Sequence, residues 1–216
     1  MSGALELSAY LITDRVLCGE RGVLEVVRRA VEGGVSLVQL RDPEAKTGQL
    51  VEQARALLSV LRPARVPLII NDRVDVALAA GADGVHVGQR DMSVADVRAL
   101  VGPDMIVGLS ISTLAELERS KAALSQVDYL GVGPIFATRT KPDAAAPIGA
   151  QGLAEVVART QLPVVAIGGL KRDNAAEAIR AGAQGIAVVS EICCASDPAL
   201  VTRELVRLVR AERARS

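Results

Sequence analysis

Two acidic side chains follow two neighbouring apolar runs, and their placement indicates a site for a divalent cation. The run 68–70 ends in Asn71 and Asp72. The run 85–87 is followed shortly by Asp91. Two strands that each finish near an acid place two carboxylates at one end of a sheet, where a hard cation finds oxygen ligands. Because Mg²⁺ usually takes one or two carboxylates plus phosphate oxygens, the pair predicts a magnesium site for a phosphorylated substrate.

Basic side chains near the ends of other apolar runs would complete this cation site. Gln39 and Arg41 close the run 35–41, and because they are two residues apart their side chains point to the same side of a strand. Lys141 lies on the polar stretch 133–149. Magnesium together with Arg41 and Lys141 suits a diphosphate better than a monophosphate, since the three cations neutralise more negative charge.

A second anion site is indicated by glycines closer to the end of the chain. Gly168 and Gly169 follow the apolar run 163–167, and Ser190 follows the run 185–189. Glycine lets backbone N–H groups approach an anion closely, and helix N-termini add a favourable dipole. One phosphate here and a diphosphate at the other site predict a transfer reaction in which diphosphate leaves.

Each of these residues taken singly has a purely structural explanation. Asp72 or Asp91 alone is more often a loop or helix-cap acid, and a glycine pair is often only a tight turn. His86, the only histidine, lies between Val85 and Val87, before the end of its run. We expect it to be a packed, hydrogen-bonded residue rather than a general base. The functional interpretation therefore depends on all the polar residues sharing one face of the fold.

Regular alternation of strand-like and helix-like segments supplies that face. Strands are expected at 9–13, 35–41, 67–71, 84–88, 105–109, 127–132, 163–167 and 185–189. Helices are expected at 22–32, 47–62, 73–80, from Ser93, from Thr113, and at 150–159, 172–181 and 197–213. Such alternation implies parallel strands joined by crossovers, and eight units without a linker predict one α/β domain over residues 1–216, a single (β/α)8 TIM barrel. An open doubly wound sheet is the alternative, but no G-x-G-x-x-G follows the first run.

Composition restricts the partners of the chain. Half of the 216 residues are hydrophobic and only three are aromatic, which suits buried parallel strands built from small aliphatic residues. The 25 basic and 25 acidic residues balance, so the basic excess that nucleic-acid binding needs is missing. We expect the Arg-rich stretch 203–213 to be the polar face of the last helix. No apolar run approaches the roughly 18 residues of a membrane span.

The cysteines indicate the cellular compartment. Cys18, Cys193 and Cys194 lack zinc-site spacing and are odd in number, so we expect reduced thiols in a cytoplasmic protein. The expected partners are small phosphorylated molecules rather than nucleic acid or membrane. The sequence leaves open whether the chain forms a homo-oligomer.

Across nearly its whole length the chain resembles thiamine-phosphate synthase, a family also called thiamine-phosphate pyrophosphorylase. The resemblance runs from Tyr10 to Pro198. The matching segments are YLITD, GGVSLVQLRD, PLIINDRVDVALAAGADGVHVGQRD, GLS, YLGVGPIFATRTK and VVAIGGL. It implies a (β/α)8 barrel, in agreement with the independent count of strands and helices.

The resemblance also implies a reaction. The family joins 4-amino-2-methyl-5-hydroxymethylpyrimidine diphosphate to 4-methyl-5-(2-phosphoethyl)thiazole, or to its carboxylate, and releases thiamine phosphate and diphosphate. Mg²⁺ is the implied cofactor. The implied mechanism is dissociative: diphosphate departs first, and the thiazole nitrogen then attacks the pyrimidine carbocation.

The family's functional residues can be carried over position by position. The implied magnesium ligands are Asp72 and Asp91. The implied contacts of the pyrimidine diphosphate are Gln39, Leu40, Arg41, Asp42, Pro43, Asn71, Ser110 and Lys141. The implied contacts of the thiazole phosphate are Thr138, Arg139, Thr140, Gly169, Val189 and Ser190. The expected catalytic groups are Arg41, Ser110 and Lys141.

Two positions depart from the family pattern. The family motif is Gln-x-Arg-x-Lys, whereas residues 39–43 are Gln-Leu-Arg-Asp-Pro, so Pro43 stands where a lysine is expected. Lys46 lies three residues further on, and we hypothesise that its long, flexible stem reaches back over the mouth. The family often has histidine two residues after Ser110, where this chain has Ser112.

Two other functions compete with the synthase. A related barrel isomerises the thiazole phosphate carboxylate as a thiazole tautomerase and needs no diphosphate site, and Pro43 counts in its favour. A non-catalytic protein that binds thiamine precursors is the second alternative. The combination of Asn71, Asp72, Asp91 and Lys141 favours the synthase over both.

Overall fold

Eight parallel strands form a closed barrel in the computed structural model, which describes residues 5–138, 140 and 145–215. The strands pair in sequence order, and β8 pairs with β1 to close the ring. Their bounds are β1 (Ala9–Ile12), β2 (Leu37–Leu40), β3 (Leu68–Asn71), β4 (Gly84–Val87), β5 (Ile106–Ile111), β6 (Tyr129–Val132), β7 (Val164–Ile167) and β8 (Gly185–Val188). The predicted (β/α)8 barrel is confirmed.

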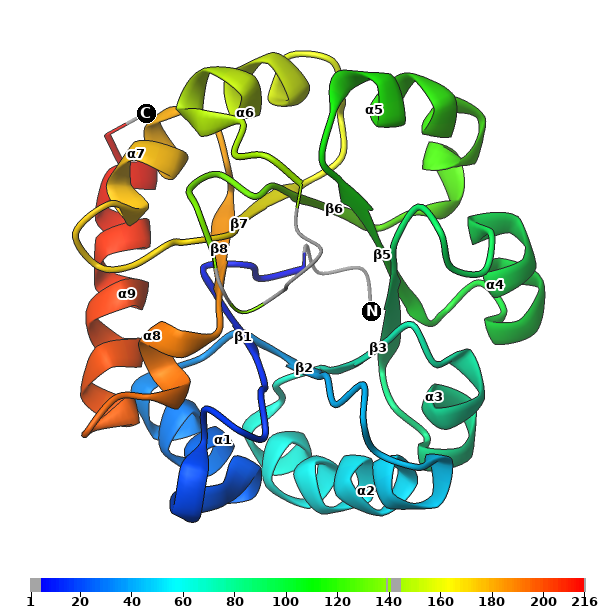
Figure 1. Cartoon of the computed structure of the whole chain (residues 1–216), viewed down its shortest axis with the longest axis vertical. Helices are drawn as coiled ribbons and strands as arrows, with labels where there is room; N and C mark the ends of the chain where they lie inside the picture. Colours follow the sequence, from blue (N-terminus) through cyan, green and yellow to red (C-terminus); the bar gives the residue numbers. More distant parts are fainter. Residues whose placement is uncertain (1–4, 139, 141–144, 216) are drawn as a thin grey trace.

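Helices surround the barrel and cover the outer face of its strands (Figure 1). The α-helices are α1 (Gly22–Gly33), α2 (Thr47–Ala64), α3 (Val74–Ala80), α4 (Val94–Val101), α5 (Leu114–Ser120), α6 (Gly149–Val157), α7 (Ala175–Arg180), α8 (Ser190–Cys193) and α9 (Pro198–Arg213). Two 3-10 turns are η1 (Gly19–Arg21) and η2 (Lys121–Gln126). No helix in the described ranges is long and apolar enough to cross a membrane.

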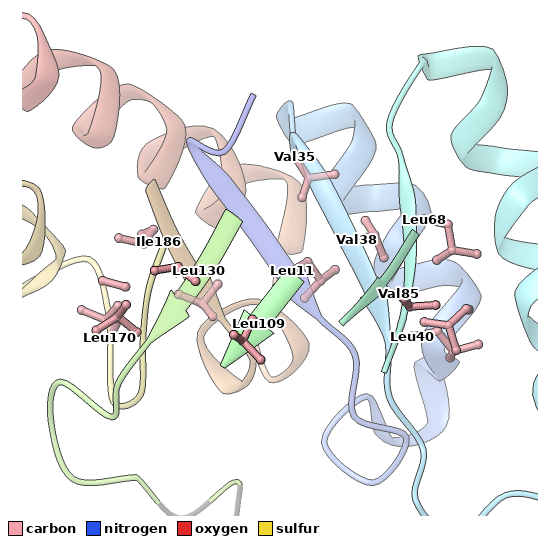
Figure 2. Close-up of a cluster of buried hydrophobic side chains, with 14 of the residues drawn as sticks. Leu11, Val35, Val38, Leu40, Leu68, Val85, Leu109, Leu130, Leu170 and Ile186 are labelled. Atoms are coloured by element: carbon pink, nitrogen blue, oxygen red, sulfur yellow. The ribbon is translucent and has the colours of Figure 1, made fainter. Parts of the chain in front are cut away.

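Side chains alternate between the two faces of each strand because successive Cβ atoms point to opposite sides. The outward set packs against the helices and is almost wholly aliphatic (Figure 2); it includes Leu11, Val38, Leu40, Leu68, Val85, Leu109, Leu130 and Ile186. The inward apolar set is smaller and fills the barrel; it includes Tyr10, Ile12, Leu37, Ile69, Tyr129, Val165 and Ala187. The same alternation turns Gln39, His86 and Ser110 away from the helices.

The predicted helix starts at Ser93 and Thr113 are confirmed, and both are set by side-chain caps. Ser93 Oγ accepts a hydrogen bond from the Asp96 N–H, and Thr113 Oγ1 accepts one from the Glu116 N–H. Glu116 does not complete a reciprocal capping box. Its carboxylate accepts a hydrogen bond from the Ser112 N–H at 2.6 Å, whereas in a capping box it would accept from the N–H of the N-cap residue Thr113. This bond fixes the chain at the point where β5 ends.

Two boundaries move beyond their predicted ends. β5 continues to Ile111 because Ser110 and Ile111 still pair with β6, so Ser110 lies within the strand rather than at its end. α2 runs to Ala64 and includes Pro63 in its last turn, two residues beyond the predicted end.

Two further differences lie near the end of the chain. α7 begins at Ala175 rather than at 172, because the Asn174 side chain first closes a turn with the Lys171 N–H at 2.8 Å. The short helix α8 directly after β8 is not predicted from the sequence, since four residues show no helical period.

Gly185 is required where β8 closes onto the chain before β1. A Cβ atom added there would lie 1.6 Å from the Leu7 carbonyl oxygen, a backbone atom that cannot move aside. We expect Gly185→Ala to lower the free energy of unfolding by about 3 kcal/mol or more. The matched control is Gly48→Ala in the first turn of α2, where nothing lies within 4 Å and stability should change by less than about 1 kcal/mol. Urea denaturation measures both, and equal stability of the two variants would contradict this account of closure.

Candidate active site

A cavity of about 580 Å³ opens at the carboxyl ends of the strands. Residues at the ends of all eight strands contribute to its wall. Because function in (β/α)8 barrels sits at this face, the cavity is the candidate active site. Within the described chain it contains most of the residues predicted from the sequence: Gln39, Arg41, Asn71, Asp72, Asp91, Ser110, Thr138, Thr140, Gly169, Val189 and Ser190.

Asp72 has a backbone conformation that few residues adopt. Its φ is 59°, in the left-handed region, and Arg65 is the only other non-glycine residue of the described chain with positive φ. Aspartate and asparagine tolerate this region better than other side chains. The Asp72 N–H donates to the His86 carbonyl at 2.8 Å, and Asn71 Nδ2 donates to Asp72 Oδ2 at 2.6 Å. β3 and β4 together therefore hold the Asp72 carboxylate at the mouth.

Asp91 is held at the end of β4 by the backbone. Its Oδ2 accepts a hydrogen bond from the Gly88 N–H at 2.7 Å. A Cβ atom on Gly88 would lie 2.9 Å from the same oxygen, so glycine allows the carboxylate to come this close. Asp91 and Asp72 thus approach one cavity from adjacent strands.

The carboxylates of Asp72 and Asp91 suit a hard cation that has coordination positions left over for substrate oxygens and water. No group of three or more His, Cys, Asp or Glu side chains in the described ranges is arranged to hold a metal. Two carboxylates at the cavity wall are what Mg²⁺ takes from a protein when phosphate oxygens and water complete its octahedron. The residues present therefore fit magnesium better than a metal held entirely by protein ligands.

The segment 39–43 is divided by the period-two alternation of β2. Gln39, 2 % exposed, and Arg41 point into the barrel mouth, and the Arg41 N–H donates to Thr13 Oγ1 at 3.1 Å. Leu40 between them points outward into the aliphatic layer under the helices (Figure 2). Leu40 is thus a predicted pyrimidine contact that lies away from the cavity wall.

Asp42 and Pro43 also lie away from the cavity wall. The Asp42 Oδ2 atom is buried without a hydrogen bond and lies 3.4 Å from Arg15 Nε, beside a separate hollow at the start of α2. Pro43 is exposed, and Lys46 is the N-cap residue of α2, outside the described wall of the mouth. The hypothesis that Lys46 replaces the family lysine therefore stays a prediction, and Lys46 does not line the cavity in this structure.

The opposite side of the mouth is built from two loops in contact. Gly168 and Gly169 have φ values of 97° and 63°, and a Cβ atom on Gly169 would lie 2.6 Å from the Ala137 carbonyl oxygen. The glycines therefore let the loop after β7 pack against the loop after β6. On that second loop the Thr138 and Thr140 hydroxyl oxygens lie 3.0 Å apart.

The remaining predicted contacts fall into two groups. Val189 and Ser190 line the cavity where β8 passes into α8, next to the glycine loop in the order of the barrel. Arg139 and Lys141 lie outside the described residues.

The cavity wall also contains residues that the sequence analysis did not single out. They are Tyr10, Thr13, Glu116 and Lys171, among others. A tyrosine in an otherwise aliphatic first strand, and a lysine two residues after the glycine pair, are signals that were available. His86 is 8 % exposed and hydrogen-bonded through both ring nitrogens, which confirms the expected packed histidine and also places it on the wall.

A closed barrel with a polar, acid-containing cavity at its carboxyl face defines the class of (β/α)8-barrel enzymes. The family model described as thiamine monophosphate synthase matches residues 9–192. The chain belongs to this thiamine-phosphate synthase family, as the sequence resemblance predicts.

Individual relatives agree with the family match. The thiamine-phosphate synthase of Azorhizobium caulinodans is 54 % identical over 99 % of this chain and all of its own length. That of Xanthobacter autotrophicus is 56 % identical with the same coverage. The solved structure of thiamine phosphate pyrophosphorylase from Pyrococcus furiosus is 38 % identical, covers 97 % of this chain and 98 % of its own, and superposes with a TM-score of 0.87.

The two phenols of the barrel interior are strongly desolvated. Burial raises the pKa of Tyr10 above its usual value, although its hydrogen bonds with Tyr129 and Gln39 lower that pKa in part. Burial raises the pKa of Tyr129 too, and the neighbouring Tyr10 raises it further. Both phenols therefore stay neutral over the range in which an exposed tyrosine ionises, around pH 10.

We expect no tyrosinate absorbance from the folded protein at about pH 10.5, whereas the urea-unfolded chain should show half-ionisation near pH 10. Because the pKa of each phenol is higher in the folded state, the unfolded chain ionises first. The free energy of unfolding is therefore unaffected by these phenols below about pH 10 and falls as pH rises from there toward the folded pKa. Alkaline spectrophotometric titration in both states checks this, with far-UV circular dichroism to establish folding. Ionisation of either phenol in the folded chain near pH 10 would contradict the buried arrangement.

Proposed function

We propose that the chain joins a hydroxymethylpyrimidine diphosphate to a thiazole phosphate and releases thiamine phosphate and diphosphate. Family membership supports the reaction. The observation that carries it is the arrangement of the cavity wall. The acids end β3 and β4, whereas the glycine loop and Ser190 follow β7 and β8, four strands away in a ring of eight. The two groups therefore face each other across one mouth, as two phosphorylated substrates require.

The acid side would bind the diphosphate. Asp72 and Asp91 would hold Mg²⁺, which when bound neutralises diphosphate and stabilises the charge that develops as it leaves. Asn71 orients the Asp72 carboxylate through its 2.6 Å hydrogen bond. Arg41 presents a guanidinium from the end of β2, a group that grips phosphate oxygens in pairs. Lys141, carried over from the family, is the second proposed cation.

The glycine side would bind the thiazole phosphate. Backbone N–H groups after Gly168 and Gly169 are open to close approach because neither residue has a side chain. The Thr138 and Thr140 hydroxyls stand on the loop that packs against them. Val189 and Ser190 complete this side from the end of β8. The acceptor molecule is thus fixed by its phosphate, with its ring toward the middle of the cavity.

The proposed chemistry is a dissociative substitution. The C–O bond between the pyrimidine methylene and diphosphate breaks first, and diphosphate leaves with the bonding electron pair. The thiazole nitrogen then forms the new C–N bond with its free lone pair, so no proton has to be removed. This explains why the single histidine, whose two ring nitrogens are both engaged, need not act as a general base.

A turnover assay with both substrates, with and without Mg²⁺, separates the synthase from its alternatives. We expect metal-dependent release of diphosphate that equals the formation of thiamine phosphate. Isomerisation of a thiazole phosphate carboxylate without metal would instead identify a tautomerase. Binding of the precursors without turnover would identify a non-catalytic binding protein.

Asp72→Asn tests the charge of the acid side. Asparagine tolerates the left-handed φ of this position, so the change removes charge while the backbone is preserved. We expect kcat to fall roughly 10²-fold or more, because electrostatic stabilisation of the leaving group is lost. The control is Asp104→Asn, an exposed acid before β5, at the other end of the barrel. Turnover within threefold of wild type in Asp72→Asn would refute the proposed role.

Gly169→Ala tests the thiazole side. The new Cβ would press on the Ala137 carbonyl and displace the loop that carries Thr138. We expect the KM for the thiazole phosphate to rise by about tenfold or more, with a smaller change in the KM for the pyrimidine. Gly149→Ala is the matched control, since Gly149 has nearly the same φ of 64° and nothing within 4 Å. Equal KM values in the two variants would show that backbone strain, not the loop contact, is responsible.

A further inference from the structure

A continuous chain of hydrogen bonds crosses the inside of the barrel. Gln39 Nε2 donates to the Tyr10 hydroxyl at 2.6 Å. The Tyr10 and Tyr129 hydroxyl oxygens lie 2.9 Å apart, and Tyr129 lies 2.9 Å from His86 Nδ1. His86 Nε2 lies 2.8 Å from Ser110 Oγ. The two ends, Gln39 and Ser110, are proposed substrate contacts on the cavity wall. Of the three residues that connect them, Tyr10 and His86 also line the wall, and Tyr129 lies beneath it.

The three middle residues of this series are buried. Tyr10 is 2 % exposed, Tyr129 is fully buried and His86 is 8 % exposed. Room for them comes from two inward-facing glycines on β5 and β6. A Cβ atom on Gly108 would lie 2.3 Å from the Tyr129 ring and 2.4 Å from His86 Nδ1, and one on Gly131 would lie 3.0 Å from His86 Cε1. Because these buried polar groups pair with one another, each hydrogen bond sets the direction of the next.

Counting the hydrogen atoms gives this series of hydrogen bonds one direction. Because Tyr10 accepts from the Gln39 amide, its own hydrogen is directed to Tyr129. Tyr129 then donates to His86 Nδ1, so a neutral imidazole carries its hydrogen on Nε2. The Nε2–H donates to Ser110 Oγ, which leaves the serine hydrogen directed into the cavity. The opposite direction requires the Gln39 amide to turn over, and it leaves Ser110 only lone pairs for a ligand.

We propose that Tyr10, Tyr129 and His86 are positioning residues that make Ser110 a hydrogen-bond donor toward the substrate, with the direction of the chain set by Gln39. The proposal rests on the proposed function, because diphosphate oxygens only accept hydrogen bonds and need a donor at this place. The same direction leaves the Gln39 carbonyl oxygen as an acceptor. The histidine thus acts through Ser110 and needs no contact with the reacting atoms.

The tautomer of His86 tests the proposal directly. His86 is the only histidine of the chain, so protein labelled with ¹⁵N-histidine gives the signals of one ring. Long-range nitrogen–proton correlation spectra of the substrate-free full chain at neutral pH assign which nitrogen carries hydrogen. We expect a neutral ring with hydrogen on Nε2. Hydrogen on Nδ1, or on both nitrogens, would overturn the proposal. No substrate is present, so the result is independent of whether the chain is a synthase.

Tyr10→Phe tests whether the direction is transmitted along the chain. The change removes one hydroxyl two hydrogen bonds away from the ring of His86. We expect the spectrum to show a mixture of both tautomers, and kcat to fall about tenfold, the factor for one misdirected hydrogen bond. A pure Nε2–H ring with wild-type kcat in Tyr10→Phe would overturn the transmitted direction.

Thr202→Val is the matched control for Tyr10→Phe. It removes another buried hydroxyl, which donates to the Pro198 carbonyl at 2.7 Å within α9, outside the barrel. Its cost in stability should be comparable, and we expect the His86 spectrum and kcat to remain those of wild type. A shift of the tautomer in Thr202→Val as well would assign the effect to lost stability and overturn the proposal.

Discussion

Closure of the barrel is the constraint on which the rest of the structure depends. Because β8 returns to β1, all eight strands end at one mouth, and the acids of β3 and β4 stand across it from the loops after β7 and β8. An open sheet with the same strands would place these groups along one edge, too far apart to share a ligand cavity. A reaction between two phosphorylated molecules suits this geometry, since each has its own side and both meet in the middle.

The side chains inside the barrel must both fill the available space and satisfy their buried polar groups. Buried hydroxyls are costly unless they are hydrogen-bonded, and the Tyr10–Tyr129–His86 series satisfies them with one another. Gly108 and Gly131 supply the space that these rings need. The floor of the cavity is therefore polar, rigid and directional, although only three aromatic residues occur in the whole chain. In the proposal made above, Ser110 at the edge of that floor takes its orientation from it.

Sequence reasoning worked where a local rule decides the outcome. Strand–helix alternation predicted the barrel, and the caps at Ser93 and Thr113 predicted helix starts. It worked less well where residues were assigned to the site only because they belong to a contiguous family motif. Residues 39–43 form one motif, yet the pleat of β2 sends Gln39 and Arg41 into the mouth and Leu40 into the outer layer. The helix α8 was missed because four residues carry no periodic signal.

The sequence by itself determined the fold, the family and most of the polar residues at the mouth, because each depends on local periodicity or on a contiguous motif. Only the tertiary structure decided which of those residues share a cavity and how they are held. The left-handed backbone of Asp72 depends on pairing between β3 and β4. The link from Gln39 to Ser110 passes through β1, β6 and β4, strands far apart in the chain. No sequence pattern encodes such contacts, since they exist only after the barrel has closed.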